Sequence, residues 1–419
     1  MAAARVAVVG GGLAGLSAAA RLKSSGHTVE LFERSRLLGG RATSFEAGGE
    51  VVDNGQHVYL ACCTAFQRFV ADAGMAHALH LQPTFDVEVW SKGSRSRLRA
   101  TSLPPPFHIL ASFVAYRYLS WSGKIRVARA LLALQRKAAR PQGTFAHWLQ
   151  THGQTPETVR AFWEPFLVPA LNAPLDRMAA EEAAFVLQTA FLSDRRAARF
   201  GYATVPLAEI METAARRLDA VHRATSVTRI DGDGAVTVST ANAGAVFDAA
   251  VLALSPSSLQ RVLGSGERFG IAQLQAFEPF AIMDAHLWHN RGSLPFDFAA
   301  ILDSPVQWIF QKRPGYLCCS LSAANAWATL ANADVAHRAW AQVQANVLPL
   351  RGAALVKSSV TRNPEGTFLR KAGAPPPGAR TNHPKIALAG AWTATGWPDT
   401  MESAVRSGET AANVVMESM

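Results

Sequence analysis

Short apolar runs, each closed by a glycine or an acid, alternate with helical patterns near the start of the chain. Residues 6–9 are uniformly apolar, as is typical of strands buried on both faces of a parallel sheet. Apolar residues then recur at helical spacing over 13–20, and Gly26 is a suitable helix stop. A second apolar run, 28–32, ends at Glu33. This pattern predicts a strand, a helix and a second strand in direct succession.

The far end of the chain repeats this pattern. Residues 386–389 form an apolar run that stops at Gly390, and a helical pattern begins at Thr400. Pro398 and Asp399 favour a helix start at that point. Three more strands are expected in the middle of the chain, at 224–230, 236–239 and 249–254.

A chain of 419 residues favours two domains, and these strands indicate an α/β fold. We expect a Rossmann-like nucleotide-binding domain from residues 1–60, 201–262 and 380–419. The intervening residues, 61–200 and 263–379, lack nucleotide-binding marks and are expected to form a discontinuous α+β substrate-binding domain. A segment rich in proline and glycine, 372–378, is a plausible crossing between the two domains.

Composition narrows the functional classes. Apolar residues make up 49% of the chain and charged residues 17%, so disorder is not expected. The formal charge of +10 suits nucleic acid, an anionic membrane or an acidic substrate. Because Lys and Arg are spread along the chain without zinc-finger or RNP patterns, we expect no nucleic-acid partner.

The cysteines form two adjacent pairs, Cys62-Cys63 and Cys318-Cys319, which suit neither a metal site nor a disulfide framework. The chain runs from Met1 directly into its first strand, which leaves no room for a secretion signal. No apolar run approaches the roughly 18 to 20 residues of a membrane span. We therefore expect a cytoplasmic protein without a metal, whose only membrane contact is peripheral, at the inner face of the cell membrane.

The first helix is preceded by a GxGxxG motif, Gly10, Gly12 and Gly15. In a dinucleotide-binding unit the first glycine makes a tight turn, the second lets a diphosphate approach, and the third lets helix and strand pack closely. The helix N-terminus offers unpaired N–H groups to the phosphates, and Glu33 is placed to bind a ribose hydroxyl. Besides Glu33, the predicted nucleotide contacts are Gly10, Gly11, Gly12, Leu13, Ala14 and Gly15.

Residues 34–41, RSRLLGGR, follow this acid. Here the chain resembles the FAD-dependent amine oxidase and phytoene desaturase superfamily, whose extended (GR2-type) fingerprint ends in a GGR element. The resemblance implies FAD as the cofactor, with Arg34, Gly40 and Arg41 beside it and the Arg41 side chain at its phosphates. A surface turn with a solvated arginine is the alternative.

The stretch 389–412 resembles the C-terminal FAD-binding motif of the same superfamily. Glu402, Ala404, Ser407 and Gly408 match it, whereas Ala391 stands where the commoner family residue is an aspartate. The resemblance implies that Gly390, Ala391, Thr400, Met401 and, through its backbone, Val227 contact FAD.

A polar DNGQH sequence at 53–57 interrupts apolar residues. Together with both termini it resembles the squalene-associated FAD-dependent desaturases, the hydroxysqualene dehydroxylase branch of bacterial hopanoid synthesis. This implies reductive removal of an allylic hydroxyl from hydroxysqualene, with Asp53 and His57 as proton donor or orienting group. Gly55, Gln56 and His57 are implied FAD contacts. The alternative is that Asp53 and His57 only bind FAD or hold a loop.

Other functions are compatible with the same FAD-binding motifs. An oxidative desaturase of phytoene type or a flavin amine oxidase would use the same fold, and a prenyl-lipid carrier would use it without redox chemistry. Reduced nicotinamide (NADPH) is a candidate electron donor, although only one dinucleotide fingerprint is present. The sequence leaves the oligomeric state open.

The middle of the chain favours a hydrophobic substrate. Residues 104–116 are apolar and aromatic, and Lys124 to Arg140 is a basic amphipathic stretch. This combination suits a helix that lies on an anionic membrane and draws an isoprenoid into the protein. The alternative is an ordinary surface helix of the substrate-binding domain.

Overall fold

Strand β1 (Arg5–Val9) is the central strand of a five-stranded parallel sheet, in a computed structural model that describes residues 3–135, 141–264, 266–370 and 374–419. The order is β10-β2-β1-β14-β20. The other four strands are β2 (Thr28–Phe32), β10 (Ala220–His222), β14 (Ala249–Leu252) and β20 (Ile386–Leu388). Three distant segments of the chain therefore build one Rossmann-like sheet, and the predicted α/β class is confirmed.

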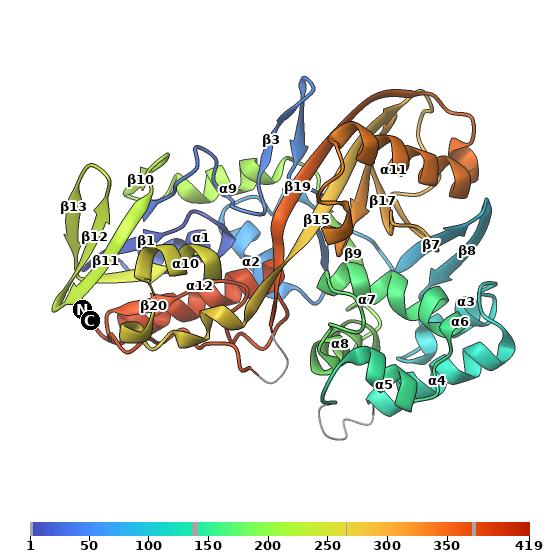
Figure 1. The fold of residues 1–419 in the computed structure, drawn as a ribbon, viewed down its shortest axis with the longest axis horizontal. Helices are drawn as coiled ribbons and strands as arrows, with labels where there is room; N and C mark the ends of the chain where they lie inside the picture. Colours follow the sequence, from blue (N-terminus) through green and yellow to red (C-terminus); the bar gives the residue numbers. More distant parts are fainter. Residues whose placement is uncertain (1–2, 136–140, 265, 371–373) are drawn as a thin grey trace.

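Two helices from opposite ends of the sequence pack side by side on this sheet (Figure 1). They are α1 (Leu13–Ser24) and α12 (Met401–Met416). A Cβ at Gly408 would lie 2.2 Å from the carbonyl oxygen of Ala14, so a side chain there would push the helices apart. The Ser17 hydroxyl also donates to the carbonyl of Val405 at 2.9 Å. The match of Gly408 to the family motif therefore has a packing reason.

The core beneath α1 extends beyond the predicted domain limits. Helix α2 (Thr64–Asp72) contributes Phe66 and Phe69 to the same hydrophobic cluster as β1. Phe269 and Leu274 likewise pack with Val9 of β1. The predicted boundaries after residues 60 and 262 therefore cut through the core of the nucleotide-binding side.

A seven-stranded sheet forms the second region, in the order β19-β15-β18-β17-β16-β7-β8. Its two long strands, β15 (Phe277–His289) and β19 (Leu355–Arg370), are paired antiparallel and extend from one lobe into the other (Figure 1). The other strands are β7 (Asp86–Ser91), β8 (Ser94–Arg99), β16 (Phe298–Ile301), β17 (Trp308–Arg313) and β18 (Tyr316–Leu321).

Helices cover both faces of this sheet. Helix α11 (Asn332–Asn346) packs on one face, and the helices between residues 107 and 186 pack on the other. These are α3 (Leu110–Val114), α4 (Trp121–Gln135), α5 (Phe145–Thr151), α6 (Pro156–Thr158), α7 (Glu164–Leu171) and α8 (Ala180–Val186). The second region is therefore α+β and discontinuous, as predicted.

Smaller elements complete the two regions. Strands β11 (Val227–Asp233), β12 (Ala235–Thr240) and β13 (Gly244–Phe247) form an antiparallel sheet beside the nucleotide-binding core. The remaining elements are β3 (Ser44–Ala47), β4 (Glu50–Asp53), β5 (Val58–Leu60), β6 (Leu79–Leu81), β9 (Phe200–Ala203), α9 (Leu207–Ala215) and α10 (Pro256–Leu263). The predicted crossing at 372–378 begins outside the described residues and is irregular from residue 374.

Candidate functional site

A cavity of about 1140 Å³ runs between the two regions and is lined by residues of both. It exceeds the roughly 300–1,000 Å³ that is usual for drug-sized ligands. Most of the predicted cofactor contacts line it: Gly10, Gly12, Leu13, Ala14, Glu33, Arg34, Gly40, Arg41, Gly55, Gln56, His57, Val227, Gly390, Ala391, Thr400 and Met401. Three predicted site residues, Gly11, Gly15 and Asp53, do not.

The glycine turn divides into packing positions and an open position. Gly10 has φ +107°, and a Cβ at Gly15 would lie 1.9 Å from the Gly10 carbonyl oxygen. Gly15 therefore serves the packing of α1 against β1. A Cβ at Gly12 would meet no atom closer than 3.9 Å, and no side chain caps α1 there. Gly12 thus leaves space beside free helix N–H groups, which fits the diphosphate of a dinucleotide.

Glu33 follows β2 and lines the cavity. Its Oε2 accepts a hydrogen bond from the Gly11 N–H at 2.7 Å, and its Oε1 accepts one from the Ser35 N–H at 2.8 Å. Gly11 therefore acts by fixing the carboxylate. A carboxylate held in this way retains lone pairs for the hydroxyls of a ribose.

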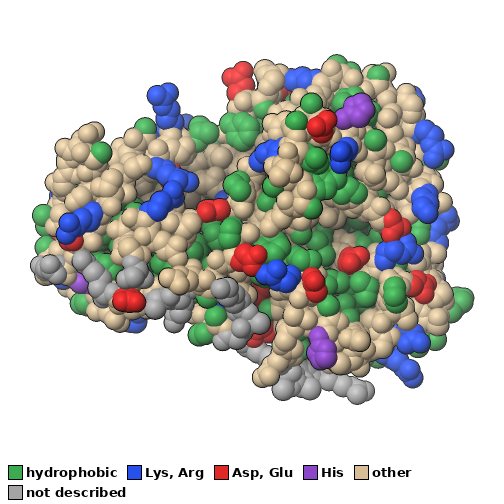
Figure 2. Space-filling view, viewed as in Figure 1, with side chains coloured by type: hydrophobic (Ala, Val, Ile, Leu, Met, Phe, Trp, Pro, Cys, Tyr) green, Lys and Arg blue, Asp and Glu red, His purple; other side chains and the backbone are tan. Residues whose placement is uncertain are grey.

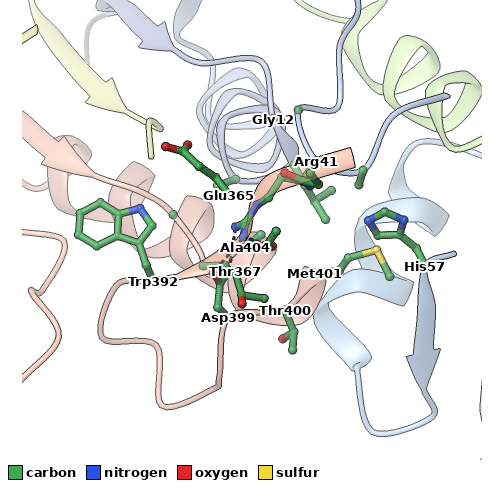
Figure 3. A pocket seen from close by; sticks show the side chains of 18 of the residues that line it. Gly12, Arg41, His57, Glu365, Thr367, Trp392, Asp399, Thr400, Met401 and Ala404 are labelled. Atoms are coloured by element: carbon green, nitrogen blue, oxygen red, sulfur yellow. Dashed lines mark hydrogen bonds and ion pairs between the residues drawn. The ribbon is translucent and has the colours of Figure 1, made fainter. Parts of the chain in front are cut away.

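Arg41 connects the GGR loop to the C-terminal motif. Its guanidinium forms a two-fold ion pair with Asp399, at 2.8 and 2.9 Å, and donates to the carbonyl of Gly366 at 2.8 Å (Figure 3). Burial lowers the pKa of Arg41, but Asp399 outweighs this and raises it overall. Asp399 also accepts the N–H of Phe368 at 2.9 Å. The guanidinium lies on the cavity wall, already paired with a carboxylate, and its predicted contact with the FAD phosphates stays a prediction.

The C-terminal motif forms the opposite wall. The Ser403 hydroxyl donates to the carbonyl of Ala391 at 2.7 Å, and the Gly390 N–H donates to the Ser407 hydroxyl at 2.9 Å. Thr400 is the N-cap of α12, whose first residue, Met401, faces the cavity. The N-terminus of α12 therefore presents its partial positive charge to whatever fills this part of the cavity.

A buried carboxylate explains why the motif carries Glu402. This residue is fully buried and accepts the N–H groups of Ala65 and Phe66 at 3.0 and 2.9 Å, at the start of α2. Arg406, one turn later on α12, pairs with it at 2.8 Å. Glu402 thereby fastens α12 to α2 from beneath the site.

The two candidate catalytic residues of the DNGQH segment lie in different places: His57 lines the cavity and Asp53 does not. Asp53 pairs with Lys312 and accepts the Ser44 hydroxyl at 2.6 Å and the Leu207 N–H at 3.0 Å. Burial raises the pKa of Asp53, but these donors, Lys312 foremost, hold it below its ordinary value. The carboxylate is therefore ionised and fully engaged outside the cavity.

His57 reaches the cavity. Its ring lines the wall, and its Nδ1 lies 3.2 Å from the carbonyl oxygen of Gly55. Burial lowers the pKa of His57, so the imidazole is neutral at neutral pH. Figure 3 shows His57 and Met401 on one side of the Arg41–Asp399 pair, with Trp392 on the other.

Sequence reasoning missed another carboxyl, Asp284 on β15. It is 3% exposed and lines the cavity. Its Oδ1 accepts the Gln56 N–H at 3.3 Å and lies 3.7 Å from the thiol of Cys318. Burial raises the pKa of Asp284 to about 6. A single acid within the mainly apolar run 279–288 is the signal that could have revealed it.

Aromatic side chains line the cavity beyond Asp284. They come from α7, α8, the π-helix Leu187–Leu192 that follows α8, β9 and β17, and are Phe166, Phe185, Phe191, Phe200, Trp308 and Phe310. The Trp308 ring packs against Phe200 at 5.4 Å and Phe166 at 6.0 Å between centroids. In Figure 2 hydrophobic side chains gather over the hollowed area between the strands of the second region and helices α7 and α8. This end of the cavity suits an apolar ligand.

Exposed apolar side chains gather elsewhere, in the segment before and along α4. Here Leu103, Phe107, Leu110, Val114, Trp121, Ile125 and Leu132 are between 43% and 66% exposed. We call these residues the α4 patch. Lys124, Arg126 and Arg129 belong to the same helix, whereas the predicted basic residues Arg136, Lys137 and Arg140 lie outside the described residues. Within the described residues, no helix is both long and apolar enough to cross a membrane.

Comparison with known proteins gives a family match over nearly the whole chain. The model of the family described as flavin containing amine oxidoreductase matches residues 13–416. Hydroxysqualene dehydroxylase of Zymomonas mobilis is 24% identical, and the match covers 98% of both chains. Hydroxysqualene dehydroxylase of Rhodopseudomonas palustris is 26% identical, again over 98% of both.

Other full-length similarities reach different branches. A probable zeta-carotene desaturase of Synechococcus elongatus is 23% identical over 99% of this chain and 98% of the relative. Among solved structures, cyclohexylamine oxidase of Brevibacterium oxydans has a TM-score of 0.72 at 18% identity, over 100% of this chain and 99% of that one. The structural likeness establishes the fold of the chain.

Proposed function

Because this chain belongs to the flavin containing amine oxidoreductase family, we propose that it is an FAD-dependent oxidoreductase that converts hydroxysqualene to squalene. The observation that carries the proposal is the cavity itself. One end has the glycine turn, Glu33 and two helix N-termini, and the other is lined by aromatic side chains around a buried carboxyl. Two full-length relatives carry the same activity in their names.

The residues suited to hold the cofactor follow from the site. Gly12 and the start of α1 would receive the diphosphate, Glu33 the ribose, and Val227 the adenine. The N-terminus of α12, at Thr400 and Met401, would stabilise negative charge on a reduced isoalloxazine. When bound and reduced, FAD supplies the hydride of this reaction.

The protein would contribute orientation, water exclusion and a proton. The aromatic wall removes the polyene chain from water and shields an allylic cation. Departure of a hydroxyl group needs a proton donor within the same cavity. Asp53 is engaged with Lys312 away from the cavity, which leaves it a positioning role for the DNGQH loop.

A single-turnover assay tests this function. The purified protein, loaded with FAD and reduced by dithionite without oxygen, is mixed with hydroxysqualene. We expect about one squalene per flavin, with reoxidation of the flavin absorbance. Dithionite is preferred to NADPH because no comparison supports a nicotinamide donor. Absence of squalene, with the substrate recovered intact, would overturn the proposal.

An oxidative isoprenoid desaturase is the second candidate, supported by the full-length similarity to a zeta-carotene desaturase. It would transfer electrons in the opposite direction. Oxidised protein with a carotene precursor would then yield a product with an added double bond, and hydroxysqualene would remain unchanged. An amine oxidase would instead release peroxide from an amine. A purified chain that stays colourless after FAD is added would indicate a carrier.

We also propose that the α4 patch rests on an anionic membrane at the inner face of the cell membrane. Its exposed apolar side chains include Trp121, and the Nζ of Lys124 lies 4.8 Å from the centre of the Trp121 ring. Apolar groups next to cations suit the boundary between acyl chains and acidic headgroups. The π-helix Leu187–Leu192, which follows α8, lines the cavity with Thr189, Ala190 and Phe191. Helix α4 packs behind it, since Gln188 of this segment donates to the Leu134 carbonyl at 2.8 Å.

Liposome co-sedimentation tests this contact. The double variant Trp121→Ser/Ile125→Ser should lose most of its binding to vesicles that contain phosphatidylglycerol, while its squalene yield in detergent stays unchanged. The matched control, Val246→Ser/Val356→Ser, removes exposed apolar residues elsewhere. Equal loss in both double variants, or binding retained in the first, would contradict the membrane contact.

A further inference from the structure

The position of Asp284 distinguishes it from the other carboxyls of the site. It projects from the middle of β15, between Ser320 of β18 and Thr361 of β19, at the junction of the two cavity halves. The DNGQH loop presses against it, because a Cβ at Gly55 would lie 2.3 Å from the Asp284 Oδ2. Gly55, with φ +85°, therefore lets the loop close over the carboxyl.

Among the described residues, no ion pair involves Asp284, and its hydrogen-bond donors are uncharged. They are the Gln56 N–H, the Cys318 thiol and the Ser320 hydroxyl. Across β19 its neighbour, Thr361, is also uncharged. The titratable groups that its charge affects are Cys318, Cys319 and Tyr316, whose own pKa values are raised by burial. The hydrogen bonds to Asp284 favour its ionised form less than burial disfavours it. Asp284 has no cationic partner of the kind that Lys312 provides for Asp53 among the described residues.

We propose that Asp284 is the general acid that protonates the leaving hydroxyl, an assignment that rests on the proposed function. The proton passes from Asp284 to the hydroxyl oxygen, the C–O bond breaks, and its electron pair leaves with water. The allylic carbon accepts a hydride from reduced flavin, which is thereby oxidised. Asp284, left as the carboxylate, takes a proton from solvent before the next turnover.

Neighbouring groups cannot take this role as the site stands. Asp53 is ionised, paired and outside the cavity. Burial lowers the pKa of His57, so the imidazole is neutral at neutral pH and is not an acid. Burial raises the pKa of the Cys318 and Cys319 thiols, so both are very weak acids. Burial raises the pKa of Asp284 to about 6, which leaves a usable protonated fraction at neutral pH.

The test compares two leaving groups. Hydroxide needs a proton to depart, whereas the acetate ester of the same alcohol departs as a stable anion. Dithionite-reduced wild type and Asp284→Asn would be given hydroxysqualene or its acetate in single turnovers. We expect Asp284→Asn to lose about 10²- to 10⁴-fold in rate on the alcohol, and less than about 10-fold on the acetate. Asp334→Asn, on the exposed face of α11, is the matched control for loss of a carboxylate.

A second measurement does not depend on turnover. In the oxidised, FAD-loaded protein, the infrared band of a protonated carboxyl should titrate near pH 6 and be missing in Asp284→Asn. Equal losses on alcohol and acetate, or an undiminished rate on the alcohol, would overturn the assignment while leaving the proposed function intact. If wild type converts neither substrate, the proposed function itself fails and takes the assignment with it.

Discussion

The two halves of the cavity are built by different means. The nucleotide-binding half consists of backbone N–H groups, glycines and carboxylates whose partners are in place, such as Glu33 with Gly11 and Asp399 with Arg41. The substrate half consists of aromatic rings around Asp284, for which the described residues provide no cation. We therefore expect the paired carboxylates of the nucleotide half to stabilise the fold. We expect the buried carboxyl of Asp284 to destabilise it when ionised, because a buried acid without a cation is suited to catalysis rather than to stability.

The largest effect is expected within the glycine turn. Gly15→Ala would place a Cβ 1.9 Å from the Gly10 carbonyl oxygen, so α1 must move away from β1. We expect the free energy of unfolding to fall by about 3 kcal/mol or more, together with loss of FAD. Chemical denaturation and flavin absorbance measure the two effects.

Gly12→Ala is the matched control for this substitution. Its Cβ has no neighbour within 3.9 Å, so the fold should be kept while FAD affinity falls. Equal destabilisation by both variants would show that the open position is also a packing position, and would break the distinction drawn within the turn.

Asp53→Asn tests whether a satisfied carboxylate stabilises the fold. It leaves Lys312, 23% exposed, without its partner, and should cost about 2–3 kcal/mol. Because the folded pKa of Asp53 lies below its ordinary value of 3.8, its contribution is present above that pH and is lost as pH falls through the folded pKa. Denaturation at pH 7 and pH 3 should therefore give a smaller difference between variant and wild type at the lower pH.

Asp284→Asn should have the opposite sign. The folded pKa is raised from 3.8 to about 6, so the stabilising contribution of Asp284 is complete below pH 3.8 and is lost as pH rises through about 6. At pH 8 the variant should be more stable than wild type by at most about 3 kcal/mol, at about 1.4 kcal/mol per pH unit. Melting curves between pH 4 and pH 8 measure this; an unchanged difference across the range would break the comparison between the two halves.

The smallest effect is expected at the aromatic wall. Phe191→Ala removes one of several rings from the substrate half and leaves the nucleotide half untouched. The KM for the isoprenoid should rise about 10-fold, a loss of about 1.4 kcal/mol, while FAD affinity stays the same. Steady-state kinetics with flavin titration separate the two quantities. A parallel loss of FAD would show that the halves are coupled.

Sequence reasoning reached the nucleotide half because its signals are local. The glycine turn, the acid after β2 and the start of α12 each lie within a few residues of the element that positions them, so a pattern of spacing identifies them. The resemblance predicted Arg41 at the FAD phosphates, but its pairing with Asp399, 358 positions later, follows only from the fold. The pattern could not show that Gly11 and Gly15 act behind the wall rather than on it.

Less of the substrate half could be predicted from the sequence, because its contacts join residues that are far apart along the chain. Asp284 meets Gln56 across 228 positions, through the pairing of long strands that no local spacing encodes. The predicted domain limit after residue 60 lies before α2, although α2 packs in the hydrophobic core of the nucleotide-binding region. The sequence of a nine-residue helix does not indicate which core it packs against. Resemblance to a family directed attention to Asp53 because it lies within a recognisable motif, whereas Asp284 lies within none.

The contact between Glu402 and the start of α2 has a consequence for the order of synthesis. Strands β1 and β2 are made long before β20, α12 and the carboxylate that fastens α2. The nascent chain must therefore keep its first sheet unfinished while more than three hundred further residues are added. The packing of α2 under the site is therefore incomplete until residue 402 has been synthesised, long after the glycine turn.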